Sequence, residues 1–182
     1  MYLVFDTETT GIAADSHIVQ IAMVQLDSGF QEIRTYSEII RPDNYEIPQQ
    51  ATDIHGITTE YALRVGVPIE HSLDAFDEMC AKSSVLVAHN IDFDLRMIKS
   101  TLTRLNRNDA TTDLSHYCTM KSSRDCVKLP PTERMVRAGR NYYKSPKLEE
   151  AYHYFNGESF DNAHDALADV WATVSVLSHL EK

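Results

Sequence analysis

The chain has 182 residues, the size of one ordinary domain and enough to enclose a hydrophobic core. Hydrophobic residues make up 43% and charged residues 24%, which is typical of a soluble globular protein, and no apolar run approaches the length of a membrane span. A charge at Asp6 directly after the apolar residues 2–5 excludes a signal-peptide core. Three cysteines without CxxC spacing predict a reducing, cytoplasmic compartment, with neither a disulfide framework nor a zinc cluster.

Short runs of apolar and β-branched residues predict an opening meander of three strands. These strands are expected at residues 2–5, at Ile18–Leu26 and at Ile33–Ile40, with Asp27-Ser28-Gly29 as the turn between the last two. An irregular connection is expected from Pro42 to Pro48, because proline interrupts regular structure.

Beyond this connection the apolar spacing is mainly helical. The expected elements are a helix beginning near Thr58 or Thr59, a helix after Pro68, a strand at Val85–Ala88, a helix from Phe93 to Leu105, a helix from Leu148 to Asn156-Gly157 and a last helix with apolar positions from Ala163 to Leu180. Residues 121–147 contain three prolines and a glycine, so we expect a loop-rich insertion within a single domain of residues 1–182. A meander followed by alternating helices and strands predicts an α/β fold with a mixed sheet.

Two acidic residues close the first predicted strand. Asp6 and Glu8 are two positions apart, so their side chains project from the same face. Ionised carboxylates that lie so close repel one another and need a counter-charge, which a divalent metal ion can supply. The alternative interpretation is a pair of solvated acids at a strand end.

Two later segments carry further candidate residues. Asp94 falls in the first turn of the helix that follows Val85–Ala88, where an acid commonly serves only the helix dipole. Asp169 lies between the apolar positions Ala166 and Val170 of the last helix, so it should border the buried face, where an unpaired charge is costly. His164 precedes Asp169 by five residues, so we expect it in the entering loop or first turn, facing the same cleft and suited to proton transfer.

Three motifs in this order resemble those of the DnaQ-like DEDDh superfamily of 3′→5′ exonucleases. They are Phe5-Asp6-Thr7-Glu8-Thr9-Thr10-Gly11, His89-Asn90-Ile91-Asp92-Phe93-Asp94 and His164-Asp165-Ala166-Leu167-Ala168-Asp169. The segment Ile54-His55-Gly56-Ile57-Thr58 also resembles one that is common between the first two motifs of the family. The resemblance extends from residue 2 to about residue 180. A histidine five residues before the last aspartate favours the histidine branch, because the tyrosine branch has its residue where Asp165 stands.

This resemblance implies a ribonuclease-H-like fold with a mixed sheet flanked by helices, in one exonuclease domain. It also implies that four acids hold two Mg²⁺ or Mn²⁺ ions and that His164 is the general base. The four implied ligands are Asp6, Glu8, Asp94 and Asp169. By the same resemblance, the terminal nucleotide would be bound by Thr9, Gln50, His55 and Ile57. His89 and Asn90, which match the second motif, are expected either to bind the substrate as well or only to shape the loop of that motif. The family often has an acid where Gln50 stands.

The implied function is a 3′→5′ exonuclease that releases nucleoside monophosphates by a two-metal-ion mechanism. The expected partner is a nucleic acid with a free 3′ end, single-stranded at its terminus, and a polymerase is a possible second partner. DNA is the favoured substrate, in a proofreading, repair or phage setting. RNA 3′-end trimming is an alternative, since the catalytic residues would be the same. A non-catalytic nucleic-acid-binding module is less favoured, because all five catalytic positions are filled.

Charge is distributed unevenly along the chain. The net charge of −10 counts against a nucleic-acid partner, because phosphate binding normally requires a basic surface. Residues 121–147, however, contain eight lysines and arginines against two acids. Two interpretations are equally open for this segment: a solvated loop or a surface that faces the substrate.

Overall fold

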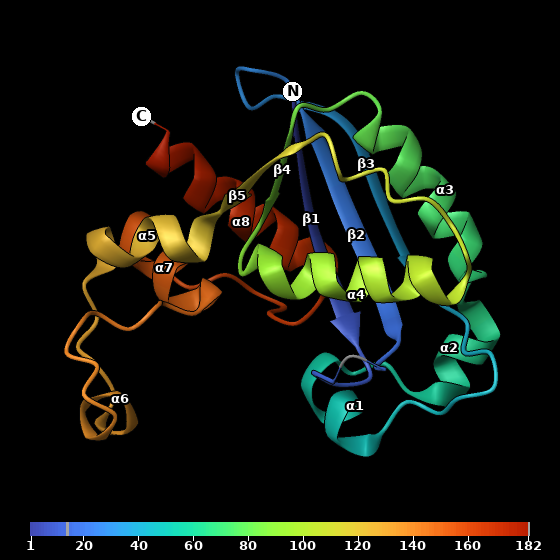
Figure 1. Ribbon diagram of the computed structural model, residues 1–182, viewed down its shortest axis with the longest axis horizontal. Coiled ribbons are helices and arrows are strands. Elements are labelled where there is room, and N and C mark those ends of the chain that lie inside the picture. The colour runs from blue at the N-terminus through green and yellow to red at the C-terminus, as the bar shows by residue number, and fades with distance from the viewer. Residues whose placement is uncertain (14, 182) are drawn as a thin grey trace.

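A mixed five-stranded sheet organises the computed structural model, which describes residues 1–13 and 15–181 (Figure 1). Its strands are β1 (Tyr2–Thr9), β2 (Ile18–Leu26), β3 (Glu32–Ile39), β4 (Val85–Ala88) and β5 (Ser115–Cys118), in the spatial order β3-β2-β1-β4-β5. The first three strands form an antiparallel meander, and β4 and β5 add in parallel on the other side of β1. The predicted mixed sheet and its opening meander are therefore confirmed.

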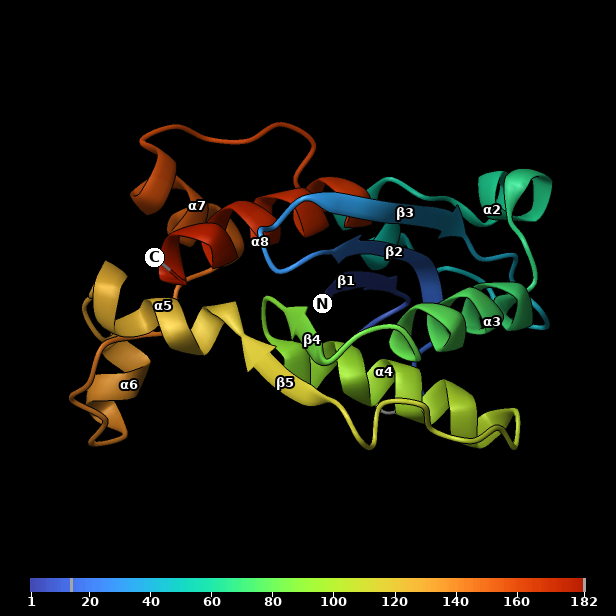
Figure 2. The ribbon, with the colours of Figure 1, turned by 90° about the horizontal axis from the view of Figure 1, so that it is seen from above.

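Helices cover both faces of this sheet. They are α1 (Gln49–His55), α2 (Thr59–Val65), α3 (Ile69–Cys80), α4 (Ile91–Arg104), α5 (Thr119–Val127), α6 (Glu133–Arg137), α7 (Leu148–Asn156) and α8 (Ala166–Leu180). Figure 2 shows α3 and α4 on one side of the strands and α8, with α7 beside it, on the other. Among residues 1–13 and 15–181, no helix combines the length and the apolar character needed to cross a bilayer.

The alternation of side chains along β1 divides the core into two parts. Leu3 and Phe5 face α3 and α4, and the Phe5 ring meets the edge of Phe76 at a centroid distance of 5.5 Å. Val4 points to the opposite face, where it packs with Val170 and Val174 of α8. The residues that follow Val4 at intervals of two therefore point toward α8.

Several elements differ from the expectations. The helix α1 and the strand β5 were not predicted, because α1 buries only Ala51 and β5 is exposed over its first two residues. The basic segment is also less irregular than expected, since α5 and α6 occupy parts of it. The expectation that the last helix extends back to Ala163 was wrong. It begins at Ala166, because His164 has a φ of 69° that cannot continue a helix.

Gly66 lies where two backbone segments approach closely after α2. A Cβ atom at this position would lie 2.5 Å from the Ala62 carbonyl oxygen and 2.6 Å from the Arg41 nitrogen. We expect Gly66→Ala to lower the free energy of unfolding by about 1–3 kcal/mol, because neither backbone atom can move away easily. Thermal or urea unfolding measures the loss. The same substitution at the exposed turn residue Gly29 is the control, and an equal effect at both positions would contradict this explanation.

Candidate active site

The first two acids lie on the part of β1 that has no β4 neighbour. The parallel pairing of β1 with β4 ends at Val4 and Val87, whereas β1 continues to Thr9. Asp6 and Glu8 follow Val4 at intervals of two, so both carboxylates project from the face that α8 covers. The predicted common face is therefore present, although β1 extends beyond both acids instead of ending before them.

Asp94 reaches the same strand from the other side of the sheet. It lies in the first turn of α4, is only 2% exposed, and its Oδ1 accepts hydrogen bonds from the Thr7 amide at 3.2 Å and the Thr7 hydroxyl at 2.8 Å. The Thr7 amide is free to donate because β4 no longer pairs with β1 at this level. Asp94 is thus fixed to the strand between Asp6 and Glu8, a role that a simple dipole partner would not have.

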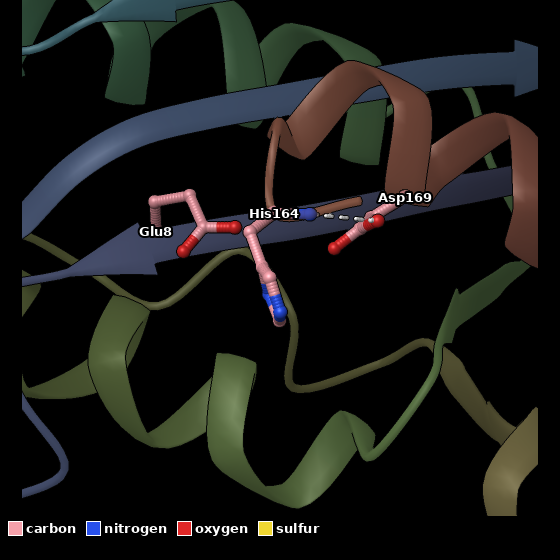
Figure 3. A group of neighbouring side chains, drawn as sticks. All are labelled: Glu8, His164 and Asp169. Carbon is pink, nitrogen blue, oxygen red and sulfur yellow. Dashed lines mark hydrogen bonds between the residues drawn. The ribbon is translucent and has the colours of Figure 1, made fainter. Parts of the chain in front are cut away.

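The remaining two candidates, His164 and Asp169, lie on either side of the first residue of α8. Asp165 caps this helix by accepting from the Leu167 and Ala168 amides, both at 3.1 Å. The left-handed conformation of His164 turns its backbone amide toward Asp169, whose Oδ1 lies 3.4 Å away (Figure 3). His164 therefore lies in the entering turn, as predicted.

Glu8, His164 and Asp169 converge on one point. Each offers a ligand atom, and these three atoms lie within 4.8 Å of one another. Figure 3 shows Glu8 on β1 facing the other two residues at the beginning of α8. Residues 8, 164 and 169 are thus close enough to share a metal ion or a water molecule.

Gln20 is a residue of this site that the motifs did not indicate. It is 6% exposed on β2, opposite Glu8 in the sheet register. Its amide group bonds the start of α8 twice: Oε1 accepts from the Ala166 amide at 3.2 Å, and Nε2 donates to Asp165 at 3.1 Å. The feature that could have indicated this role is a glutamine within a largely apolar strand, because the structure buries every position of β2.

The carboxylates raise one another's pKa values. Burial, followed by the charges of Asp94, Asp169 and Glu8, raises the pKa of Asp6 well above its ordinary range. Burial and the neighbouring acids raise the pKa of Glu8 to about 8, and burial is the main cause that raises the pKa of Asp94 to about 7 and that of Asp169 to about 6. The charge of His164 opposes the rise only for Asp169, so most of the negative charge of these acids is uncompensated.

The donor set fits hard divalent cations. Carboxylate oxygens are the ligands that Mg²⁺ and Mn²⁺ prefer, and the mutual repulsion of Asp6, Glu8 and Asp169 is what such a cation would neutralise. The Asp94 oxygen that binds Thr7 is oriented by that contact, which leaves its second oxygen to serve as a ligand.

The predicted nucleotide-binding residues differ in their distance from the carboxylates and in their exposure. His55 lies beside the site, where it interacts with the Thr9 backbone and with His164. Burial lowers the pKa of His55, the Thr9 backbone partly offsets this, and the charge of His164 lowers it further. The Thr9 hydroxyl donates to the Gly11 carbonyl at 2.8 Å, so it stabilises the turn after β1. The side chain of Ile57 is buried in a small cluster with Val19, and Gln50 is exposed on α1.

His89 and Asn90 shape the loop between β4 and α4. The His89 ring bonds the Thr119 hydroxyl at 2.9 Å and the Pro146 carbonyl at 3.1 Å, so both of its nitrogens are occupied away from the carboxylates. Asn90 has a φ of 76° and precedes the first residue of α4. These contacts support the loop-shaping role that the sequence left open.

A cavity of about 170 Å³ adjoins the convergence point. Its lining joins α7, the loop before α8 and α8 itself, with Lys147, Leu148, Glu149, Phe160, Ala163, His164 and Asp169. Glu149 Oε1 lies 3.9 Å from His164 Nε2. The motifs did not indicate the residues from the start of α7, because they are distant in sequence.

Comparison with known proteins identifies the family. The exonuclease family model (RNase T) matches residues 3–177, nearly the whole chain. The chain belongs to this exonuclease family, within the DnaQ-like superfamily. An uncharacterized exonuclease, CP81, of Escherichia phage 186 is 30% identical over 180 residues, which cover 97% of this chain and 86% of the phage protein. The family and the fold together identify a nuclease that hydrolyses nucleic acid.

Two further likenesses concern parts of larger proteins. DNA polymerase III PolC-type of Streptococcus suis is 40% identical over 95 residues, which span 52% of this chain but 6% of the polymerase. The fold is similar to that of E. coli exonuclease I in complex with a dT13 oligonucleotide, with a TM-score of 0.81 at 23% identity. That match covers all of this chain and 41% of the exonuclease I chain, and it confirms the ribonuclease-H-like fold.

The raised pKa values predict a pH-dependent stability. Without a divalent ion, the folded state retains protons that the unfolded acids release near their ordinary values of 3.8 and 4.5. The free energy of unfolding should therefore fall as pH rises from about 4 to about 8. Saturating Mg²⁺ or Mn²⁺ should reduce this decline by binding the ionised carboxylates. Asp94→Asn, which keeps an acceptor for Thr7, should also reduce it in EDTA. Melting temperatures between pH 5 and pH 8 test this, and identical wild-type curves with EDTA and metal would contradict it.

Gln20 predicts a coupled loss of stability and activity. Gln20→Leu leaves the buried Ala166 amide without its acceptor, so the free energy of unfolding should fall by about 1–3 kcal/mol. The rate should fall as well, because the turn that carries His164 is no longer held. Gln25→Leu is the matched control, since Gln25 is equally buried on β2 but binds Met79 and Ser83. Equal kcat values for the two folded variants would show that Gln20 has no positioning role.

Proposed function

We propose that the protein is a metal-dependent 3′→5′ exonuclease that releases nucleoside monophosphates from DNA. The observation that carries this proposal is the convergence of Glu8, His164 and Asp169, with Asp94 close enough for its charge to raise the pKa values of Asp6 and Glu8. Family membership supplies the reaction class, and the site supplies residues able to perform it.

In this proposal Asp6, Glu8, Asp94 and Asp169 hold two divalent ions, Mg²⁺ or Mn²⁺. Such ions, when bound, stabilise the negative charge on the entering and leaving oxygens of a phosphodiester. The four acids come from β1, α4 and α8, so the folded sheet fixes their separations before substrate binds. The Thr7 and Gln20 contacts reduce the freedom of two of these elements further.

His164 is the general base in this mechanism. Its side chain is about half exposed, so water can reach the imidazole beside Glu8 and Asp169. The ring takes a proton from the attacking water as the phosphorus–oxygen bond to the terminal nucleotide breaks. His55 and the turn at Thr9 lie next to this point and are the residues proposed to position the terminal nucleotide.

DNA is the favoured substrate because several similar proteins bind or make DNA. The exonuclease I structures include complexes with dT13 and dA16 oligonucleotides, and the PolC-type relatives are DNA polymerases. The proposed partner is accordingly a DNA with a single-stranded 3′ terminus. RNA 3′-end trimming is the second candidate, since the same acids and histidine would serve it. A non-catalytic binding module is disfavoured, because all five catalytic positions are filled.

The same chemistry would serve a proofreading enzyme and a repair or phage enzyme. Proofreading would require faster removal of a mismatched 3′ nucleotide than of a paired one, and association with a polymerase. A repair or phage enzyme would degrade unpaired strands without this preference. Comparison of matched and mismatched primer termini therefore distinguishes these two settings.

A labelled-strand assay tests the proposed function. Single-stranded DNA, duplex DNA and RNA of one sequence, each labelled at either end, are incubated with Mg²⁺, Mn²⁺ or EDTA. We expect mononucleotide release from the 3′ end of DNA with either metal and none with EDTA. Release from the 5′ end, internal cleavage or full activity in EDTA would refute the proposal. Faster release from RNA would select the second candidate.

Variants of the site should separate metal binding from proton transfer. Asp6→Ala should abolish turnover, because the transition-state charge loses its stabiliser, whereas His164→Ala should lower kcat about 10²–10⁴-fold. Both variants should remain folded by circular dichroism. Isothermal titration with Mn²⁺ should show weaker binding for Asp6→Ala than for His164→Ala. Near wild-type rates for Asp6→Ala at saturating Mg²⁺ would show that the site is assigned incorrectly.

A further inference from the structure

The segment between α5 and α7, residues 128–147, projects from the body of the fold and is called the arm here. Figures 1 and 2 show α6, within the arm, at the edge of the molecule beyond α5 and α7. The neck of the arm is closed, because the Lys144 amide donates to the Leu129 carbonyl at 3.1 Å. The arm contributes no buried residue to the two main core clusters, so packing of the core does not explain its composition.

Besides Lys147, its last residue, three basic side chains of the arm are free of ion pairs among the described residues. The arm contains six lysines and arginines and one acid. Arg137 pairs with Glu133 and Lys144 pairs with Glu150. Within residues 1–13 and 15–181, no carboxylate forms an ion pair with Lys128, Arg134 or Arg140, and all three are exposed. Their charge is therefore available to a negatively charged partner.

An open hollow of about 380 Å³ lies between α5 and the returning half of the arm. It is lined by Arg124, Asp125, Pro131, Asn141, Tyr142 and Tyr143. Tyr142 and Tyr143 are 52% and 42% exposed, which is unusual for two adjacent large aromatic residues. The cation in this hollow, Arg124, pairs with Asp125, so the unpaired cations of the arm lie outside its lining. Exposed aromatic rings are a surface on which the bases of a single strand can stack, while cations elsewhere along the arm neutralise its phosphates.

The arm is also connected to the candidate active site. Lys147, its last residue, is exposed and lines the cavity that His164 and Asp169 share. Through Pro146 the arm is bonded to His89, in the loop that leads to α4 and Asp94. A strand that enters at the arm can therefore pass Lys147 on its way to the carboxylates, whereas the net charge of −10 of the whole chain opposes the approach of phosphates.

We propose that the arm binds the single-stranded nucleic acid upstream of the terminal nucleotide. Lys128, Arg134 and Arg140 contact phosphates, and Tyr142 and Tyr143 stack on bases. This inference rests on the proposed function, since it assigns a second, longer part of the substrate site. A protein partner for the arm is the competing occupant, and the charge and exposed rings favour the strand because both match its chemistry.

The test compares a long and a short substrate for variants of the arm. The substrates are a 5′-fluorescein oligodeoxythymidine of roughly 15 nucleotides, near the upper size of single-strand sites, and a thymidine dinucleotide. Arg134→Glu/Arg140→Glu should raise KM for the long strand and reduce its salt slope by about 0.7 for each phosphate that is no longer neutralised. Tyr142→Ala/Tyr143→Ala should weaken binding of the long strand roughly five- to a hundredfold. In both variants, KM for cleavage of the dinucleotide should change less than KM for the long strand.

The matched control is Lys82→Glu/Arg41→Glu, which makes the same change in net charge on exposed residues outside the arm. It should leave the salt slope unaltered. Fluorescence anisotropy with the long strand in EDTA measures binding without turnover, so the arm is tested even if the proposed activity fails. Unchanged affinity and salt slope in both arm variants would overturn the inference, and so would an equal loss in the control.

Discussion

Like charges held close together are the constraint on which the rest of this structure depends. Four carboxylates meet where β1 continues beyond its β4 neighbour, and burial, followed by the charges of neighbouring acids, raises their pKa values. Such an arrangement opposes folding, so it persists only where surrounding contacts hold it. This arrangement of carboxylates is possible because β4 ends early. The edge of β1 beyond Val4 is not paired with β4, so the Thr7 amide can donate to Asp94.

Hydrogen bonds from uncharged donors provide much of that support. Thr7 fixes the acid from α4, Gln20 fixes the start of α8 and Asp165 caps the same helix. None of these contacts adds a positive charge, so they orient the acids without neutralising them. The charge imbalance is thereby kept available for an ion and a phosphodiester instead of being satisfied by internal salt bridges. Several ion pairs of the described residues, such as Arg34–Glu78 and Arg137–Glu133, lie on the surface, where they contribute little.

The sequence indicated those parts of the fold and site that depend on local patterns. The alternation of β1 placed Asp6 and Glu8 on one face, and the helical spacing around Asp169 placed it at a buried edge. The role of Gln20 could not be seen locally, because its partners lie about 145 residues away across the sheet. Helix α1 and strand β5 were missed because their few buried residues leave weak periodicity. The residues predicted to bind the nucleotide were the hardest to infer from sequence, since Ile57 packs in a small core cluster and the Thr9 hydroxyl stabilises a turn.

The closed neck of the arm has a consequence for how this fold can vary. Because Leu129 and Lys144 are joined by a backbone hydrogen bond, residues 130–143 form a compact excursion of the Ω-loop kind, whose ends do not move when its interior changes. The entropic cost of closing such a loop grows slowly with its length, so residues can be inserted or removed there at little expense to the sheet. His89 separately ties Pro146 and Thr119 to the loop before α4. Residues 130–143 can therefore differ in length and sequence between related chains. Such differences would alter the surface of the arm while the arrangement of the carboxylates stays the same.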